Sequence, residues 1–251
     1  MDLQLRDKVA LITGAGSGIG AAIARTLAAE GAVVYAGDLD VAAASRQVQA
    51  LSREGLRAFE IALDVGDQAA IEAAVRQIEE RQGRIDILVN SAGIVRTGLL
   101  DTMQTSDWRA LSTVNVEGIF TCSRAVLGGM VARRYGKILN LASISAFKGG
   151  GLFGNTLYGT SKAAVIALTL GFAREYGPHG VNVNAMAPGL TQTAMTASMS
   201  DADRENLKTR IPVRRVAEPQ DIANVAAFLV SDRASYVNGA TLVVDGGVLT
   251  L

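Results

Sequence analysis

Two side chains with complementary acid–base chemistry, Tyr158 and Lys162, stand four positions apart. On an α-helix this spacing places both side chains on one face. The pKa of an isolated tyrosine is about 10, so its phenolate is scarce at neutral pH. A neighbouring ammonium group stabilises the phenolate and lowers that pKa, and a positively charged nicotinamide would act in the same way. The pair is therefore a candidate proton-transfer device.

A serine and an asparagine upstream could complete such a site. Ser143 follows residues 136–141 (GKILNL), whose apolar pattern predicts a strand, and its hydroxyl could donate a hydrogen bond to a substrate oxygen. Asn115 falls inside a predicted helical region, residues 106–134, where asparagine is mildly unfavourable. By itself Asn115 would be interpreted as a surface or helix-packing residue. The tyrosine–lysine spacing alone also occurs by chance in many helices.

The glycine-rich residues 9–20 (VALITGAGSGIG) organise the N-terminal half of the chain. After an apolar start that predicts a buried parallel strand, Gly14, Gly16, Gly18 and Gly20 place four residues without Cβ within seven positions. A helix predicted over residues 18–30 points its N-terminus at this turn, where its dipole and free N–H groups favour a phosphate. Ile19 replaces the last glycine of G-x-G-x-x-G, so the pattern is T-G-x-x-x-G-x-G. Glycines alone also fit a structural turn.

A carboxylate ends the second predicted strand, residues 32–38 (AVVYAGD). Asp38 lies about twenty residues past the glycine turn, the place where a ribose 2′-hydroxyl is held in dinucleotide-binding folds. Asp38 could also cap the helix predicted over residues 41–54, and the two roles are compatible. A carboxylate here would repel a 2′-phosphate, and neither position 17 nor position 39 carries a basic residue. The sequence therefore favours NAD over NADP.

Strands and helices are predicted to alternate along the chain. After the first strand, strands are predicted at residues 32–38, 56–63, 85–90, 136–141, 181–187 and 241–244, and helices at 18–30, 41–54, 67–82, 106–134, 157–176 and 222–229. This order is typical of an α/β fold with a doubly wound parallel sheet, here of about seven strands, whose carboxyl ends share one ligand-binding edge. Residues 1–251 are predicted to form a single domain. The polar residues 191–210, with Met195 and Met199, are predicted to form a mobile lid.

Composition excludes several classes of protein. Of 251 residues, 49% are hydrophobic, yet no stretch reaches the about 20 apolar residues of a membrane span. The N-terminus MDLQLRDK lacks the pattern of a signal peptide. Twenty-four basic residues balance twenty-four acidic ones, so no surface for nucleic acid or for a membrane is expected. The single cysteine, Cys122, indicates a reducing cytoplasm, and the single histidine, His179, excludes a multi-histidine metal site.

Taken in order, these motifs resemble those of the short-chain dehydrogenase/reductase family over essentially all 251 residues. The matching segments are residues 13–20 (TGAGSGIG), Asp64-Val65, residues 90–93 (NSAG), Asn115, Ser143, residues 158–162 (YGTSK) and Pro188-Gly189. The resemblance implies a Rossmann fold, hydride transfer between a nicotinamide cofactor and an alcohol or ketone carbon, and a homotetramer.

The resemblance also implies roles for individual residues. Tyr158 would be the general acid/base, Ser143 would orient the substrate oxygen, and Lys162 would hold the nicotinamide ribose. Asn115 would anchor a water that relays protons. The expected cofactor-binding residues are Gly14, Ser17, Gly18, Ile19, Gly20, Asp38, Asp64, Val65, Asn90, Gly93, Tyr158, Lys162, Pro188, Gly189, Thr191 and Thr193. Asp64 and Val65 would contact adenine, Asn90 would lie near the adenosine ribose, and Thr191 and Thr193 would approach the carboxamide.

The chain departs from the family pattern in two places. Ser91 stands where a second asparagine is common, which is a mild change. Ser143 and Tyr158 are fifteen positions apart, slightly more than usual, and the added residues fall in residues 147–156 (FKGGGLFGNT) on the expected substrate side. This insertion affects which substrate is bound. A partly apolar pocket is expected from Met195, Met199, Phe147, Leu152 and Phe153.

Three functions remain to be compared. The first is an NAD-dependent dehydrogenase of a secondary alcohol, a sugar, a polyol or a cyclic alcohol. The second is an NADPH-dependent 3-oxoacyl-carrier-protein reductase, which the C-terminal half resembles and for which Arg133, Arg134 and Arg174 could dock an acidic carrier; Asp38 and Ser17 oppose it. The third is a non-catalytic NAD-binding sensor, which would not need Ser143, Tyr158, Lys162 and Asn115 together.

Overall fold

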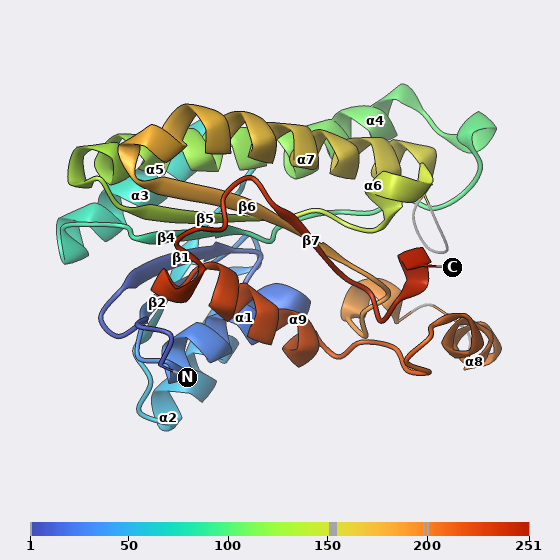
Figure 1. Ribbon diagram of the computed structural model, residues 1–251, viewed down its shortest axis with the longest axis horizontal. Helices are drawn as coiled ribbons and strands as arrows, with labels where there is room; N and C mark the ends of the chain where they lie inside the picture. Colours follow the sequence, from blue (N-terminus) through green and yellow to red (C-terminus); the bar gives the residue numbers. More distant parts are fainter. Residues whose placement is uncertain (1, 151–154, 198, 200, 251) are drawn as a thin grey trace.

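Seven parallel strands form one twisted sheet in the order β3-β2-β1-β4-β5-β6-β7 (Figure 1). The computed structural model describes residues 2–150, 155–197, 199 and 201–250, with the side chains of 201–204 left out. The strands are β1 (Val9–Thr13), β2 (Val33–Asp38), β3 (Ala58–Ala62), β4 (Ile87–Asn90), β5 (Gly136–Leu141), β6 (Val181–Pro188) and β7 (Thr241–Val244). The predicted doubly wound α/β fold is confirmed.

Helices cover both faces of the sheet (Figure 1). One face carries α1 (Gly18–Ala29), α2 (Val41–Arg53) and α9 (Pro219–Leu229), and the other carries α3 (Gln68–Gln82), α4 (Thr105–Ser112), α5 (Gly118–Arg133) and α7 (Thr156–Tyr176). Two shorter helices, α6 (Ser145–Lys148) and α8 (Asp201–Arg210), lie at the edge formed by the strand carboxyl ends. No helix in the described part of the chain is long and apolar enough to cross a membrane.

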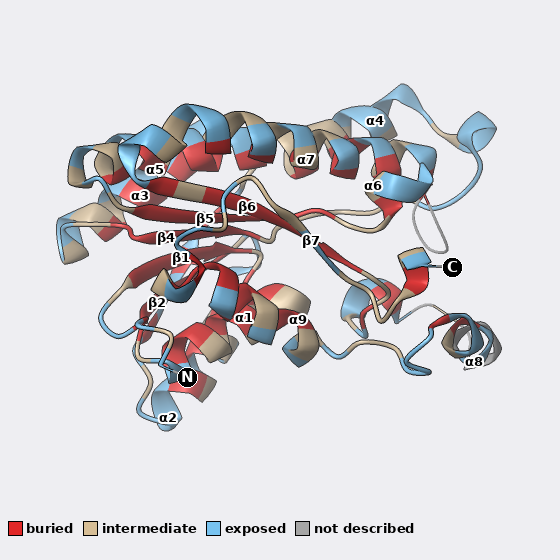
Figure 2. Ribbon diagram, in the orientation of Figure 1, coloured by how far each residue is buried: buried red, intermediate tan, exposed pale blue. Residues whose placement is uncertain are grey.

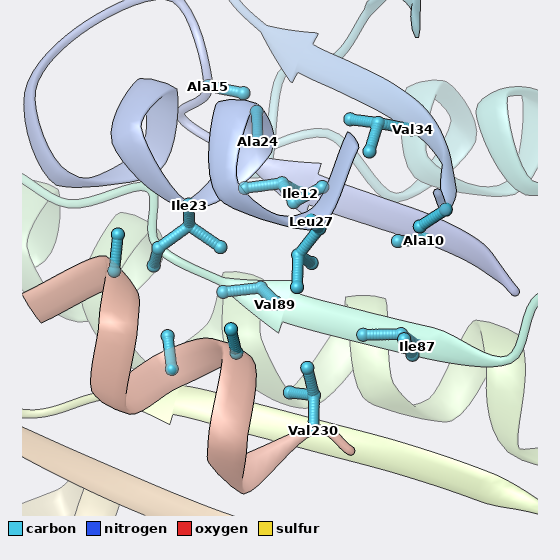
Figure 3. Packing of buried hydrophobic residues seen from close by; sticks show 14 of the residues in the cluster. Ala10, Ile12, Ala15, Ile23, Ala24, Leu27, Val34, Ile87, Val89 and Val230 are labelled. Atoms are coloured by element: carbon cyan, nitrogen blue, oxygen red, sulfur yellow. The ribbon is translucent and has the colours of Figure 1, made fainter. Parts of the chain in front are cut away.

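The apolar runs in the sequence arise because the central strands are buried on both faces (Figure 2). In β1, Ala10 and Ile12 pack with α1 and α9, as the close view shows (Figure 3), whereas Val9 and Leu11 face α3 and α5. All four side chains are at most 3% exposed. Burial on two faces makes these strands hydrophobic at every position, which is why a continuous apolar run predicted them correctly.

The strand order reverses between β1 and β4, and the carboxyl ends of these two strands are joined by a side chain. The hydroxyl oxygen of Thr13 accepts hydrogen bonds from the backbone N–H groups of Ser91 and Ala92, at 3.1 and 3.0 Å. Thr13 is 1% exposed. This contact holds the glycine turn after β1 against the segment after β4. In open α/β sheets such a reversal is where ligands bind.

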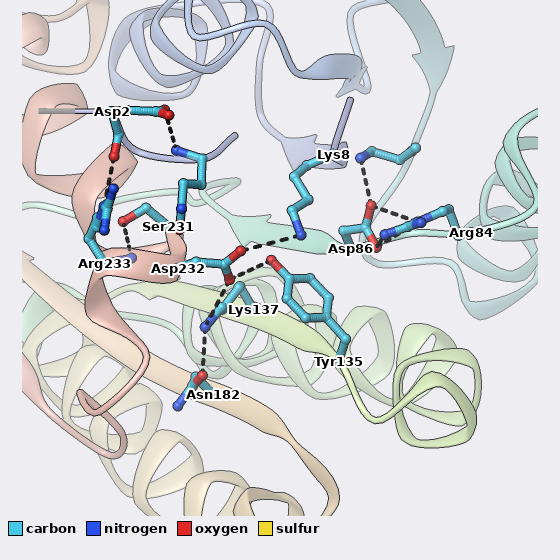
Figure 4. A network of polar contacts seen from close by, with 12 residues as sticks. Asp2, Lys8, Arg84, Asp86, Tyr135, Lys137, Asn182, Ser231, Asp232 and Arg233 are labelled. Carbon is cyan, nitrogen blue, oxygen red and sulfur yellow. Dashed lines mark hydrogen bonds and ion pairs between the residues drawn. The ribbon is translucent and has the colours of Figure 1, made fainter. Parts of the chain in front are cut away.

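A polar network lies at the amino-terminal ends of the strands, opposite the glycine turn (Figure 4). The Asp232 carboxylate accepts a hydrogen bond from the Tyr135 hydroxyl at 2.9 Å and forms ion pairs with Lys8 at 3.4 Å and Lys137 at 3.8 Å. Asp86, which is fully buried, accepts from Arg84 and from the N–H of Val9. These contacts join the N-terminus, β5 and the segment after α9. The network therefore stabilises the packing at the amino-terminal ends of the strands, away from the glycine turn.

The structure differs from the sequence prediction at two elements. The single helix predicted over residues 106–134 is interrupted by a five-residue π-helical segment, Thr113–Glu117, between α4 and α5. The predicted lid, residues 191–210, contains the helix α8, which was not predicted because its sequence is almost entirely polar. Leu152 and Phe153, which were expected to line the pocket, lie outside the described residues.

Candidate active site

A cavity of about 480 Å³ opens at the carboxyl edge of the sheet, across the point where the strand order reverses. Most of the residues predicted from the sequence line it. They are Gly14, Ser17, Gly18, Ile19, Gly20, Asp38, Asp64, Val65, Gly93, Ser143, Tyr158, Lys162, Pro188, Gly189, Thr191 and Thr193. Residues from seven separate parts of the sequence thus meet around one space. Asn90 and Asn115 are not among the lining residues.

The glycine turn has the shape of a phosphate cradle. Gly14 has a φ of 68°, a left-handed conformation that favours glycine. A Cβ on Gly20 would lie 2.1 Å from the carbonyl oxygen of Gly14, so the first turn of α1 packs directly on the loop before it. The N-terminus of α1 therefore reaches the cavity with its N–H groups exposed to a ligand. These residues fit the pyrophosphate of a dinucleotide.

Asp38 contacts the glycine turn through its side chain. One carboxylate oxygen accepts a hydrogen bond from the N–H of Gly16 at 2.8 Å, and the other accepts from the N–H of Asp40 at 2.9 Å. The alternative that Asp38 caps the following helix is wrong, because Asp40 is the N-cap of α2 and accepts from the N–H of Ala43. Asp38 lines the cavity at the end of β2 and remains available to a ribose hydroxyl there.

The residues predicted to transfer a proton come from the segment after β5 and from the start of α7. Ser143 follows the end of β5, and Tyr158 is in the first turn of α7 with Lys162 one turn later. Lys162 is 4% exposed, and its ammonium donates a hydrogen bond to the carbonyl of Leu141 at 2.7 Å and lies 5.9 Å from the centre of the Tyr158 ring. Because α7 packs against β5, all three side chains face one end of the cavity.

The pKa of Tyr158 shifts in the direction opposite to the sequence prediction. Burial raises the pKa of Tyr158, and a hydrogen bond with Ser143 offsets this in part. Burial also lowers the pKa of Lys162 to about 8. The lowering expected from the neighbouring ammonium is outweighed because Lys162 is itself desolvated and directs a hydrogen bond to Leu141. In the protein alone, Tyr158 is therefore held as a proton donor.

Asn115 is fully buried in the π-helical segment, and its amide is occupied. Its Oδ1 accepts from the N–H of Ile94, while its Nδ2 donates to the carbonyl of Ile94 and to the hydroxyl of Ser161, at 2.9, 2.9 and 3.1 Å. The side chain thus joins the segment after β4 to α7. A water bound at this residue would have to use its backbone carbonyl, which a π-helical segment can leave free.

Asn90 was expected near the adenosine ribose, but its side chain lies inside the sheet. Asn90 is 2% exposed, and its Nδ2 donates to Asn140 at 2.8 Å and to Ser123 at 3.2 Å. The amide points towards α5 and β5 and not into the cavity, because β4 presents alternate residues to opposite faces. Any contribution of Asn90 to ligand binding would come from its backbone.

Two residues near the site were not singled out from the sequence. Asn155 caps α7, since its Oδ1 accepts from the N–H of Tyr158 at 3.0 Å, and its own N–H donates to the carbonyl of Arg96 at 3.1 Å. An asparagine directly before a helix is a recognised capping signal that could have predicted this. Lys148, at the end of α6, lines the cavity, and no local pattern predicted its position.

We expect Asn155→Ala to weaken both stability and turnover. Loss of an N-cap costs about 1 kcal/mol. The same bond fixes the first turn of α7, so a displaced Tyr158 should lower kcat several-fold with little change in cofactor affinity. Asn155→Asp, which keeps the accepting oxygen, should recover most of both losses. Urea unfolding and initial rates measure the two effects; an equal kcat in Asn155→Ala and the wild-type protein would contradict the positioning role.

Burial of Lys162 predicts a specific dependence of stability on pH. The pKa of Lys162 is lowered from 10.5 to about 8 in the folded protein. Between these values the unfolded chain binds the proton and the folded protein does not, so the free energy of unfolding should rise with pH by up to about 1.4 kcal/mol per unit. Above about 10, Tyr158 acts in the opposite direction, because its raised pKa keeps the folded state protonated.

The measurement is urea unfolding from pH 8 to 10 in the wild-type protein and in Lys162→Met. Other groups titrate in both proteins, so the difference between the two curves isolates Lys162. We expect the wild-type curve to rise relative to that of the variant. Parallel curves would show that Lys162 is not desolvated in the folded protein.

Comparison with known proteins agrees with this geometry. The family model described as enoyl-(acyl carrier protein) reductase matches residues 14–249. A 3-oxoacyl-(acyl-carrier-protein) reductase of Thermotoga maritima is 40% identical over 98% of this chain and 100% of its own. Meso-2,3-butanediol dehydrogenase of Serratia marcescens is 38% identical over 98% of this chain and 96% of its own. The crystal structure of a gluconate 5-dehydrogenase from Burkholderia cenocepacia, in complex with NADP and tartrate, has a TM-score of 0.93 and 36% identity, covering 100% of this chain and 98% of the other.

The fold and the cavity define a dinucleotide-binding oxidoreductase with a Rossmann fold. More particularly, the chain belongs to the short-chain dehydrogenase/reductase family, as the family match and the identity over almost the whole chain show. It is an NAD(P)-dependent enzyme that acts on CH–OH or keto groups. In the part of the chain that the structure describes, no group of three or more His, Cys, Asp or Glu side chains could hold a metal ion.

Proposed function

We propose that this protein is an NAD-dependent dehydrogenase that converts a small secondary alcohol, of the polyol, sugar or cyclic type, to its ketone. The supporting observation is that Ser143, Tyr158 and Lys162 face one end of the cavity while Asp38 faces the other. A nicotinamide dinucleotide, when bound, supplies the hydride acceptor for oxidation or the donor for reduction. The glycine turn would hold its pyrophosphate and Asp38 a ribose.

The residues of the chain handle the proton. The Ser143 hydroxyl oxygen accepts from the N–H of Ser145 at 3.1 Å, and its own proton is directed to the Tyr158 oxygen, beside which a substrate oxygen would receive it. Tyr158 would take the hydroxyl proton during oxidation and return it during reduction. Lys162 would bind the nicotinamide ribose and favour the phenolate. The backbone of Asn115 would hold the water that passes the proton to solvent.

Two features support NAD as the cofactor. Asp38 lines the cavity with a carboxylate that would repel the 2′-phosphate of NADP. Leu39, the next residue, is 72% exposed and apolar, and Ser17 also offers no positive charge. For the other cofactor-binding residues we propose the roles that the family resemblance implies: Asp64 and Val65 would contact adenine, and Thr191 and Thr193 would approach the carboxamide. The side chain of Asn90 is the exception.

The alternative function is reduction of a 3-oxoacyl group on a carrier protein with NADPH, as named for the Thermotoga relative. The arginines proposed to dock an acidic carrier do not border the cavity. Arg133 and Arg134 precede β5 at the far edge of the sheet, where Arg133 donates to the carbonyl of Ile85, and Arg174 lies near the distal end of α7. Within one chain, these residues cannot guide a carrier to Tyr158.

The outer faces of α5 and α7 support a homotetramer. Gly128 on α5 and Gly171 on α7 have no atoms near their would-be Cβ positions, and Phe120 is 40% exposed beside Phe172. Open space beside two glycines and an exposed aromatic ring fit helix packing between copies. Sedimentation of the protein as a monomer would contradict this.

We also propose a cytoplasmic location and a lid formed by residues 191–210.

Initial rates at the reduced-nicotinamide absorbance band test the function. The panel contains secondary alcohols, polyols and sugars with NAD and with NADP, and ketones and acetoacetyl thioesters in the reverse direction. We expect turnover of an alcohol or sugar with preference for NAD. A preference for NADPH with the thioester would overturn the proposal and support the carrier-protein reductase.

A further inference from the structure

Lys148 lies at the substrate end of the cavity. It ends α6, the short helix that directly follows Ser143, and it lines the cavity together with Ser143 and Tyr158. Its side chain is exposed, so it can reach a ligand without leaving a packed environment. Its place in the fold therefore suits a contact with substrate rather than with the adenosine part of the cofactor, which Asp38 would hold on the other side of the glycine turn.

The backbone around Lys148 is fixed against the catalytic helix. Gly149 ends α6 in a left-handed conformation with a φ of 65°, and the N–H of Gly150 donates to the carbonyl of Ser145 at 3.0 Å. A Cβ on Gly159 would lie 2.3 Å from the backbone nitrogen of Gly150. The turn after Lys148 thus packs directly on the residue that follows Tyr158. Lys148 is held near the reacting end of the cavity by close contact between backbones.

The positive charge of Lys148 has no counter-charge within the described structure. Among lysine and arginine side chains that the structure describes, only Lys148 and Lys162 line the cavity, and Lys162 is buried with its ammonium on the carbonyl of Leu141. The lining carboxylates lie on the other side of the glycine turn, where Asp38 is the last residue of β2 and Asp64 follows β3. With the described residues, Lys148 forms no ion pair or hydrogen bond that would occupy its ammonium.

The remaining surface at this end is largely apolar. Its lining includes Ile94, Ile144, Leu207, Ile211 and Val248. Leu207 and Ile211 are buried at the end of α8, 6% and 4% exposed. The Lys148 ammonium is exposed to water in the free protein, but a ligand packed between it and these apolar walls would exclude part of that water and so strengthen the attraction for an anion. A matching ligand has a short carbon chain and one negative charge.

We propose that Lys148 binds a carboxylate of the substrate, so that the substrate is a hydroxy acid oxidised to an oxo acid. This inference rests on the proposed function, since it uses Ser143 and Tyr158 to place the reacting alcohol. The ammonium of one lysine balances one carboxylate. A phosphate, with nearly two negative charges, would leave one charge uncompensated in a largely apolar space.

The test compares oxo acids with their uncharged methyl esters. A series from acetoacetate to longer oxo acids, each beside its methyl ester, is reduced by the wild-type protein, Lys148→Met and Lys148→Glu. We expect the wild-type ratio of kcat/KM for acid over ester to be about tenfold higher than in Lys148→Met for at least one chain length, and lower still in Lys148→Glu. Added salt should reduce the wild-type ratio because it screens the charge.

Arg76→Met provides the matched control. Arg76 is an exposed residue of α3 that does not line the cavity, and its replacement removes the same net charge. We expect Arg76→Met to keep the wild-type ratio. If the esters are turned over and the ratio of kcat/KM for acid over ester is the same in the wild-type protein and in Lys148→Met, this inference alone is overturned. Absence of turnover for every acid and ester, in a protein that oxidises an alcohol or sugar of the first panel, would also overturn this inference alone. Absence of turnover in both panels, with both cofactors, would overturn the proposed function and this inference with it.

Discussion

Tyr158→Phe is expected to lower kcat/KM by about 10²–10⁴-fold in both directions, because general acid–base catalysis contributes a factor of this size. The variant removes only the hydroxyl group. The ring would still fill its place beside Lys162, which lies 5.9 Å from its centre. Burial raises the pKa of Tyr158, so the hydroxyl is the group that delivers a proton to a ketone in the resting protein.

Cofactor binding should survive this substitution. The glycine turn and Asp38 lie at the other end of the cavity and have no contact with the phenol. Titration with reduced nicotinamide dinucleotide, followed by fluorescence, measures the dissociation constant, and initial rates measure kcat/KM. Tyr236→Phe is the control, since Tyr236 is fully exposed and outside the cavity. A fully active Tyr158→Phe protein would remove Tyr158 from the mechanism.

Replacement of Asp38 is expected to produce the second large effect, a change in the choice of cofactor. A hydrogen bond to a charged group contributes about 1.5–3 kcal/mol, so Asp38→Ala should lower kcat/KM with NAD by about tenfold to a hundredfold. The same change removes the repulsion of a 2′-phosphate, so kcat/KM with NADP should rise. The ratio of the two values should therefore change by more than either value alone.

Two further variants separate cofactor recognition from damage to the loop. Asp38 accepts hydrogen bonds from Gly16 and Asp40, and Asp38→Asn retains one accepting oxygen while losing the charge. Leu39→Arg leaves Asp38 in place and adds a cation at an exposed position, where it could meet a phosphate. We expect both variants to move the preference towards NADP. A wild-type preference for NADP would refute the proposal that Asp38 selects NAD. An unchanged ratio of kcat/KM with NAD to kcat/KM with NADP in Asp38→Asn would show that Asp38 only shapes the glycine turn.

The sequence alone determined the fold class and predicted most of the side chains that the structure places around the cavity. A continuous apolar run such as residues 9–12 predicts a strand buried on both faces, and the alternation of strands and helices predicts a parallel sheet with one ligand-binding edge. Tyr158 and Lys162 share a helix face because of local geometry that no distant contact can alter. These predictions succeeded because each depends on periodicity within one element or on connection rules between neighbouring elements.

Only the tertiary structure decided what each polar group contacts. Asp38 holds the glycine turn rather than capping a helix, and Asn90 points into the helix layer rather than the cavity. The shifted pKa values of Tyr158 and Lys162 follow from burial, which depends on how α7 packs on β5. Lys148 reaches the cavity because its turn packs on Gly159. Hydrogen bonds, desolvation and exposure arise between segments far apart in the chain, so no local pattern in the sequence encodes them.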